Sequence, residues 1–223
     1  MGVPEHRGLS KRWIMQAVEN SLKRLNTDYI DLYFAHWPDE NTPYEETLAV
    51  FDQLKQQGKI RAYGTSNLDA TQLQQSIDAA KQINVPNYQV LQPEYNLYDR
   101  QGFEQNLKQI CLDHDIGVVS YYSLASGFLS GKYRDLEQVR GSKRADSLSK
   151  YFTARGERIL NALDLVAEHH NAKPADVALA WVLTREGITA PIASATTVEQ
   201  IESFSKALAL KLTTGDLRIL EVD

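Results

Sequence analysis

Strand-like segments recur about every thirty residues in this chain of 223 residues, and this spacing limits the folds that it can adopt. The segments begin near residues 29, 60, 88 and 117, and a stretch with helical periodicity follows each one. Strands that alternate with helices at this period form parallel βαβ units. The pattern therefore predicts an α/β fold, either an open doubly wound sheet or part of a (β/α)8 barrel. No GxGxxG motif follows any of these strands, which weakens the nucleotide-binding open sheet.

Caps and apolar stripes mark the helices between the strands. Ser10 is placed to cap a helix over 11–25, and Thr42 to cap one that starts at Pro43 and ends at Gly58. Further helices are predicted at 69–83, 101–113, 155–169, 174–186 and 198–208, with a fifth strand at 189–195. A polar stretch near 131–150 predicts a long loop. Because no break in composition divides the chain, we expect a single domain over residues 1–223.

Charge and cysteine content exclude several classes of protein. The net charge is −5 and the pI is near 5.6, so nothing indicates a nucleic-acid partner. Cys111 has no second cysteine with which to pair, which favours a reducing cytoplasm. No apolar run approaches the length of a membrane span, and no pair of histidines has metal-ligand spacing with a third ligand.

Hydrogen-bonding and aromatic residues stand where the predicted strands finish, and in either architecture chemistry is located at those ends. In chain order they are His36-Trp37, Ser66-Asn67, Gln92, Tyr121 and the run from Ser194 to Thr197. Taken alone, His36 is more simply explained as a hydrogen-bonded core histidine, and Ser66-Asn67 as an ordinary turn with a cap. Five consecutive strand ends of this kind predict one polar, aromatic-lined mouth.

Several blocks in this order resemble the aldo-keto reductase family. They are "SLKRLNTDYIDLYFAHWPD", "GKIRAYGTSN", "QPEYNL", "GVVSYYSLASGFLSGKY" and "IASATTVEQIE", and the match runs in register from about Gly8 to the end of the chain. The resemblance implies a (β/α)8 TIM barrel that reduces aldehydes and ketones with NADPH and without a metal. It implies that His36 is the catalytic residue that polarises the substrate carbonyl.

The resemblance also assigns residues to the cofactor and the substrate. Around the nicotinamide it implies Ser66, Asn67, Gln92 and the stacking ring of Tyr121. Around the phosphates it implies Tyr122, Ser123, Leu124, Gly127, Lys132, Arg144, Ser194, Thr196 and Gln200. Trp37 and Tyr95 would wall the substrate pocket. Gln200 stands where some members carry an arginine for the 2′-phosphate, so NADPH follows from the resemblance and NADH stays open.

Register with the family also implies that part of the barrel precedes this chain. Only about five of eight strands, the fourth to the eighth, have counterparts, as expected for an N-terminally truncated member. Of the family's catalytic aspartate, tyrosine, lysine and histidine, only His36 is matched. We therefore expect poor activity from the isolated chain, and association or aggregation through an open barrel edge. The alternatives are a nucleotide-binding regulatory subunit, like the channel-associated members of the family, and an inactive remnant.

Overall fold

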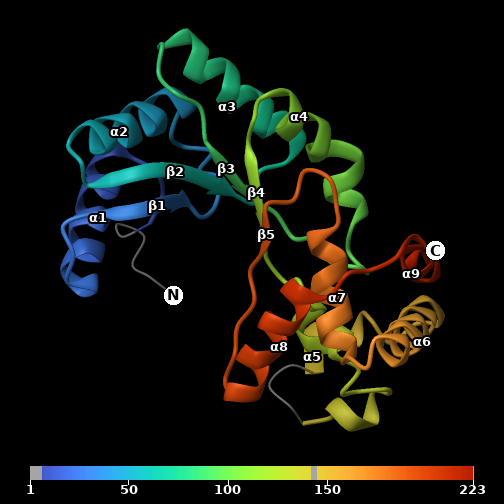
Figure 1. Cartoon of the computed structure of the whole chain (residues 1–223). Coiled ribbons are helices and arrows are strands. Elements are labelled where there is room, and N and C mark those ends of the chain that lie inside the picture. The colour runs from blue at the N-terminus through green and yellow to red at the C-terminus, as the bar shows by residue number, and fades with distance from the viewer. Residues whose placement is uncertain (1–6, 142–144, 223) are drawn as a thin grey trace. The chain divides into compact units, whose positions relative to one another are not determined.

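The computed structural model describes residues 7–141 and 145–222 (Figure 1). Its five strands pair in parallel in the order β1-β2-β3-β4-β5, which confirms an α/β fold with a parallel sheet. The chain forms two compact units. Unit 1 comprises Met1–Pro93 and Gln105–Val118, and unit 2 comprises Glu94–Glu104 and Val119–Asp223. Strand β4 (Gly117–Ser120) contributes residues to both units.

Unit 1 is built from strand–helix repeats. In sequence they are α1 (Lys11–Leu25), β1 (Ile30–Ala35), α2 (Tyr44–Gln56), β2 (Ile60–Ser66), α3 (Ala70–Gln82), β3 (Val90–Gln92) and α4 (Lys108–Asp113). Figure 1 shows β1 and β2 side by side, with α2 and α3 along one flank. Leu48, Phe51 and Leu54 of α2 are buried as their helical spacing predicts, and with Tyr63 and Tyr88 they form the core of this unit.

Two helix starts in unit 1 test the predicted caps. Ser10 caps α1, where its Oγ accepts a hydrogen bond from the Trp13 backbone N–H at 3.4 Å. The prediction for α2 is wrong, because the N-cap residue is Pro43 and no side chain caps this helix. The Thr42 hydroxyl instead donates to Asp39 Oδ2 at 2.8 Å.

Unit 2 packs helices around α7 (Pro174–Leu183), whose residues Val177 to Val182 are all buried. The other elements of this part of the chain are η2 (Phe103–Leu107, a π-helix that both units share), η3 (Ala125–Ser130), η4 (Glu137–Val139), α5 (Ala145–Ser149), α6 (Ala154–His169), β5 (Ala190–Pro191), α8 (Val198–Ala209) and α9 (Thr214–Leu220). The predicted loop near 131–150 thus contains two short helices, η4 and α5. None of the helices in the described ranges has the length and apolar character that crossing a membrane requires.

Helix α9 is absent from the sequence-based prediction, and a buried aspartate fixes its start. The Asp216 carboxylate accepts hydrogen bonds from the Thr213 backbone N–H and hydroxyl at 2.8 and 2.7 Å, and it lies 2.8 Å from His170 Nε2 at the end of α6. Burial alone would raise the pKa of Asp216, but the contacts with His170 and Thr213 outweigh it and lower the pKa to about 2. The ionised carboxylate therefore ties α9 to α6.

Acid is expected to weaken this contact between α9 and α6. Because the pKa of Asp216 is about 2 in the folded chain and 3.8 ordinarily, its stabilisation is complete above about pH 4 and is lost as the pH falls towards 2. We expect Asp216→Asn to lower the free energy of unfolding near pH 7 by about 1–3 kcal/mol and to remove this part of the acid dependence. Urea titrations between pH 2 and 7 measure both effects. Asp164→Asn, in an exposed ion pair with Arg134, is the control and should cost under about 1 kcal/mol.

Candidate functional site

Hydrogen bonds tie together the ends of the first three strands in unit 1. Asn67 Nδ2 donates to the His36 carbonyl oxygen at 2.8 Å and to Ser66 Oγ at 3.1 Å, and Ser66 Oγ donates to the Gln92 carbonyl oxygen at 2.8 Å. The strands end level because Ala35 pairs with Thr65 and Ser66 pairs with Gln92. Asn67 has a φ of 61°, a left-handed conformation that asparagine tolerates better than most residues. Four of the predicted site residues are therefore neighbours.

His36 and Trp37 extend from this cluster. Both side chains are exposed, Trp37 by 62%, and their rings stack with centroids 6.0 Å apart and planes 20° from parallel. Strand β1 ends at the fully buried Ala35, so the chain leaves the core immediately before these two residues. An exposed imidazole at a strand end is available to a ligand, whereas a core histidine would be enclosed.

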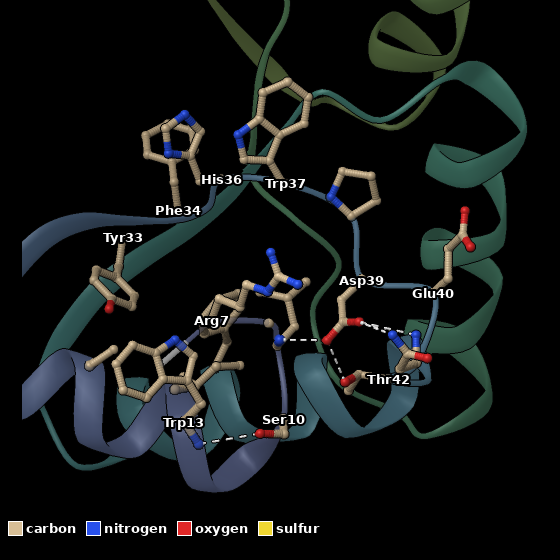
Figure 2. A pocket seen from close by; sticks show the side chains of 17 residues that line it. Arg7, Ser10, Trp13, Tyr33, Phe34, His36, Trp37, Asp39, Glu40 and Thr42 are labelled. Atoms are coloured by element: carbon tan, nitrogen blue, oxygen red, sulfur yellow. Dashed lines mark hydrogen bonds between the residues drawn. The ribbon is translucent and has the colours of Figure 1, made fainter. Parts of the chain in front are cut away.

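A cavity of about 1110 Å³ lies beside this strand end in unit 1 (Figure 2). His36 and Trp37 contribute to its lining, together with apolar side chains of α1 and β1 such as Trp13 and Phe34. Asp39 also lines the cavity, and its carboxylate accepts hydrogen bonds from the Leu9 backbone N–H and the Thr42 hydroxyl, both at 2.8 Å. Partial burial would raise the pKa of Asp39, but these bonds outweigh it and lower the pKa. The carboxylate holds the loop after β1 against the start of α1.

In unit 2, Tyr121 and Tyr122 follow β4 directly. Their rings meet edge to face with centroids 5.1 Å apart. Tyr121 forms a parallel bridge with Glu94, and its carbonyl oxygen accepts a hydrogen bond from the Tyr95 N–H at 3.3 Å. Burial first, and then the negative charge of Glu94, raise the pKa of Tyr121, so its ring stays neutral at working pH.

The segment predicted to hold the cofactor phosphates contains a series of left-handed residues. Tyr122, Ala125 and Ser126 have φ values of 52°, 50° and 58°, and Gly127 has 102°. Non-glycine residues in this region are strained, and strained backbone gathers at ligand sites. Ser123 is buried, with its hydroxyl donating to the Ser120 carbonyl oxygen at 3.0 Å, so only its backbone is available to a ligand.

Two basic residues were predicted on the following loop. Lys132 places its ammonium 5.1 Å from the centre of the Tyr133 ring, a cation–π contact. Arg144 lies outside the residues that the structure describes, so its predicted contact with the cofactor stays a prediction.

The start of α8 holds the remaining predicted cofactor residues. The Thr196 N–H donates to Gln200 Oε1 at 2.7 Å, and Ser194 is exposed. Thr197 is the N-cap residue of α8, although its side chain makes no capping hydrogen bond. Glu199 turns back onto the helix start, where its own backbone N–H and then the Thr197 hydroxyl lower its pKa. An ionised carboxylate therefore stands at a helix end that would otherwise attract anions.

Tyr95 does not take the position predicted for it. Its side chain is fully buried, its ring stacks on that of Trp181 with centroids 5.6 Å apart, and its hydroxyl donates to Glu104 Oε1 at 2.7 Å. A residue enclosed in the core of unit 2 does not wall a substrate pocket. The prediction came from the family resemblance, whereas in this structure strand β3 ends at Gln92 and Tyr95 packs into the core beyond it.

A charged cluster beside Tyr121 was not predicted from the sequence. Lys150 Nζ lies 3.4 Å from Glu94 Oε1 and 3.2 Å from Asp99 Oδ2, and the Tyr151 hydroxyl donates to Asp99 Oδ2 at 2.7 Å. No local spacing signals these contacts, because their partners lie more than fifty residues apart in the chain. Within the described residues, no three His, Cys, Asp or Glu side chains are grouped so as to hold a metal ion.

Comparison with known proteins identifies the family. The model of the aldo/keto reductase family matches residues 2–222. The chain is 34% identical over 214 residues to the aldo-keto reductase YhdN of Bacillus subtilis, covering 94% of this chain and 62% of that protein. It is 31% identical over 224 residues to an NADH-specific methylglyoxal reductase of Escherichia coli, covering 96% and 65%.

A third relative is named as a channel subunit and not as a reductase. The chain is 31% identical over 210 residues to a probable voltage-gated potassium channel subunit beta of Arabidopsis thaliana, covering 92% of this chain and 64% of that protein. The chain thus spans less than two thirds of the length of each of these relatives. The family model nevertheless matches nearly the whole of this sequence. The chain therefore belongs to the aldo/keto reductase family.

Proposed function

We propose that this chain carries the carbonyl-polarising and cofactor-binding residues of an oxidoreductase that reduces aldehydes and ketones with a nicotinamide cofactor, within a (β/α)8 barrel. The observation that carries the proposal is the set of hydrogen bonds from Asn67 and Ser66 that joins His36 to Gln92. His36 donates a hydrogen bond to the substrate carbonyl oxygen and polarises it for hydride attack. The exposed Trp37 covers the substrate beside it.

The donor set in unit 1 fits a nicotinamide carboxamide. The side-chain amide of Gln92 forms no hydrogen bond with the described residues, and it offers both a donor and an acceptor. A carboxamide has the complementary pair, so two hydrogen bonds fix which face of the ring is presented. The bound cofactor supplies the hydride. In unit 2, Tyr121 stacks on the ring, and the backbone from Tyr122 to Gly127, with Lys132, receives the phosphates.

The start of α8 argues against strong selection for a 2′-phosphate. The Glu199 carboxylate occupies the helix end, and Gln200 carries no charge with which to pair a phosphate. NADPH is the cofactor that the family resemblance implies. We propose that NADH also binds, a preference that the name of the methylglyoxal reductase relative states for that enzyme.

Similarity to potassium channel beta subunits supports a second candidate function, a nucleotide-binding regulatory subunit. Reduction also needs a proton for the alkoxide, and loss of a general acid costs about 10²–10⁴-fold in rate. His36 is the one residue of the family's catalytic four that this sequence matches in register. Binding without turnover would favour the regulatory candidate.

Fluorescence titration with NADPH and NADH tests the proposal. We expect saturable binding of both cofactors, and Gln92→Leu should weaken it about tenfold because two hydrogen bonds to the carboxamide are lost. Gln82→Leu, an exposed glutamine on α3, is the matched control and should change nothing. A turnover assay with an activated aldehyde then separates the two candidates. Equal binding by the Gln92→Leu variant would overturn the assignment.

A further inference from the structure

The charged cluster beside Tyr121 carries one net negative charge. It consists of two carboxylates, Glu94 and Asp99, and one ammonium, Lys150, which contacts both. The side chains of Glu94 and Asp99 are only 32% and 28% exposed, so water screens them incompletely. Asp99 also accepts a hydrogen bond from the Tyr151 hydroxyl, and the backbone of Glu94 forms a bridge with that of Tyr121.

The charge of Glu94 acts on the ring of Tyr121. The backbones of the two residues form an isolated parallel bridge just beyond β3 and β4, so the two residues are direct neighbours. After burial, Glu94 is the largest influence that raises the pKa of Tyr121, and Lys150 opposes it. A group stacked on this ring would therefore experience the same two opposing charges.

Nicotinamide changes its charge in the hydride transfer that the proposed function requires, because the oxidised ring is positive and the reduced ring is neutral. We infer that Glu94 and Lys150 set, in opposite directions, the relative affinity of this chain for the oxidised and the reduced cofactor. This inference rests on the proposed function, in which the ring stacks on Tyr121. The Glu94 carboxylate attracts the oxidised ring, and the Lys150 ammonium reduces that attraction.

Two charge-removing variants test the inference. Dissociation constants of NADP+ and NADPH are measured at pH 8 for the full chain, for Glu94→Gln and for Lys150→Met. Glu94→Gln should raise the ratio of the NADP+ constant to the NADPH constant by about 3- to 30-fold, and Lys150→Met should lower it by a similar factor. The phosphates of the two cofactors are identical, so a disturbance of the phosphate-binding loop cancels in the ratio.

Exposed residues elsewhere in unit 2 provide matched controls. Glu168→Gln on α6 and Lys211→Met after α8 remove the same charges and should leave the ratio unchanged. A purely structural role for the cluster would weaken both cofactors in both variants and leave the ratio as it was, which would overturn the inference. Shifts of the ratio in one common direction would overturn it as well. If the unaltered chain binds neither cofactor, the proposed function fails, and this inference fails with it.

Discussion

Replacing Gly156 by alanine is expected to destabilise unit 2 by about 3 kcal/mol or more. Gly156 lies in the first turn of α6, and a Cβ built there would sit 1.9 Å from the Tyr151 carbonyl oxygen and 3.0 Å from Phe128 Cζ. The carbonyl cannot rotate away at low cost, because it accepts a hydrogen bond from the Thr153 N–H at 2.9 Å. The helix must move instead, and Tyr151 would lose its packing on Phe128.

Gly102→Ala is the matched control for this experiment. Gly102 is helical and exposed, also belongs to unit 2, and has no atom within 4 Å of a built Cβ. Alanine there should stabilise the chain slightly, by about 0.4–1 kcal/mol, because it restricts the unfolded chain. Urea unfolding followed by circular dichroism measures both variants. Equal midpoints for the two would show that the close approach of α6 to Tyr151 is not a constraint.

Trp181→Ala is expected to cost about 3–5 kcal/mol. Trp181 is the largest of the fully buried side chains, and Tyr95 stacks on it. The guanidinium groups of Arg185 and Arg100 lie 5.0 and 5.7 Å from its ring centre, so the substitution removes cation–π contacts in addition to leaving a cavity. The midpoint of thermal unfolding should fall accordingly.

Trp37→Ala provides a comparison with the same change in side chain at an exposed position. Because Trp37 is 62% exposed and stacks only on His36 among the described aromatic rings, we expect a change in stability below about 1 kcal/mol. A similar loss of stability in both variants would contradict the assignment of Trp181 to the core. The Trp37 variant should instead weaken the binding of carbonyl substrates under the proposed function.

The sequence predicted the elements whose signals are local. Helix α2 is an example, since the spacing of Leu48, Phe51 and Leu54 marks its buried face and Gly58, with a φ of 74°, ends it. Strand β5 has two residues and is shorter than the predicted 189–195, because apolar character extends beyond the paired positions. Helix α9 was missed although Thr213 and Asp216 form a capping box, a signal that could have found it.

The same distinction between local signals and long-range contacts applies to the candidate site. His36, Ser66, Asn67 and Gln92 could be grouped in advance because the carboxyl ends of neighbouring parallel strands meet at one edge. The burial of Tyr95 and the pairing of Lys150 with Glu94 could not be predicted. Both depend on contacts between distant parts of the chain, which neither periodicity nor a motif encodes.

The path of the chain through its two units constrains how the protein can form during synthesis. Unit 1 takes its second segment, Gln105–Val118, only after the chain has passed through Glu94–Glu104 of unit 2. Residue 118 must therefore emerge from the ribosome before the first unit has all its parts. By then the Glu94–Glu104 segment of the second unit has emerged as well. Neither unit is a single continuous segment of the chain, so a nascent-chain experiment should show protease resistance rising only after this length.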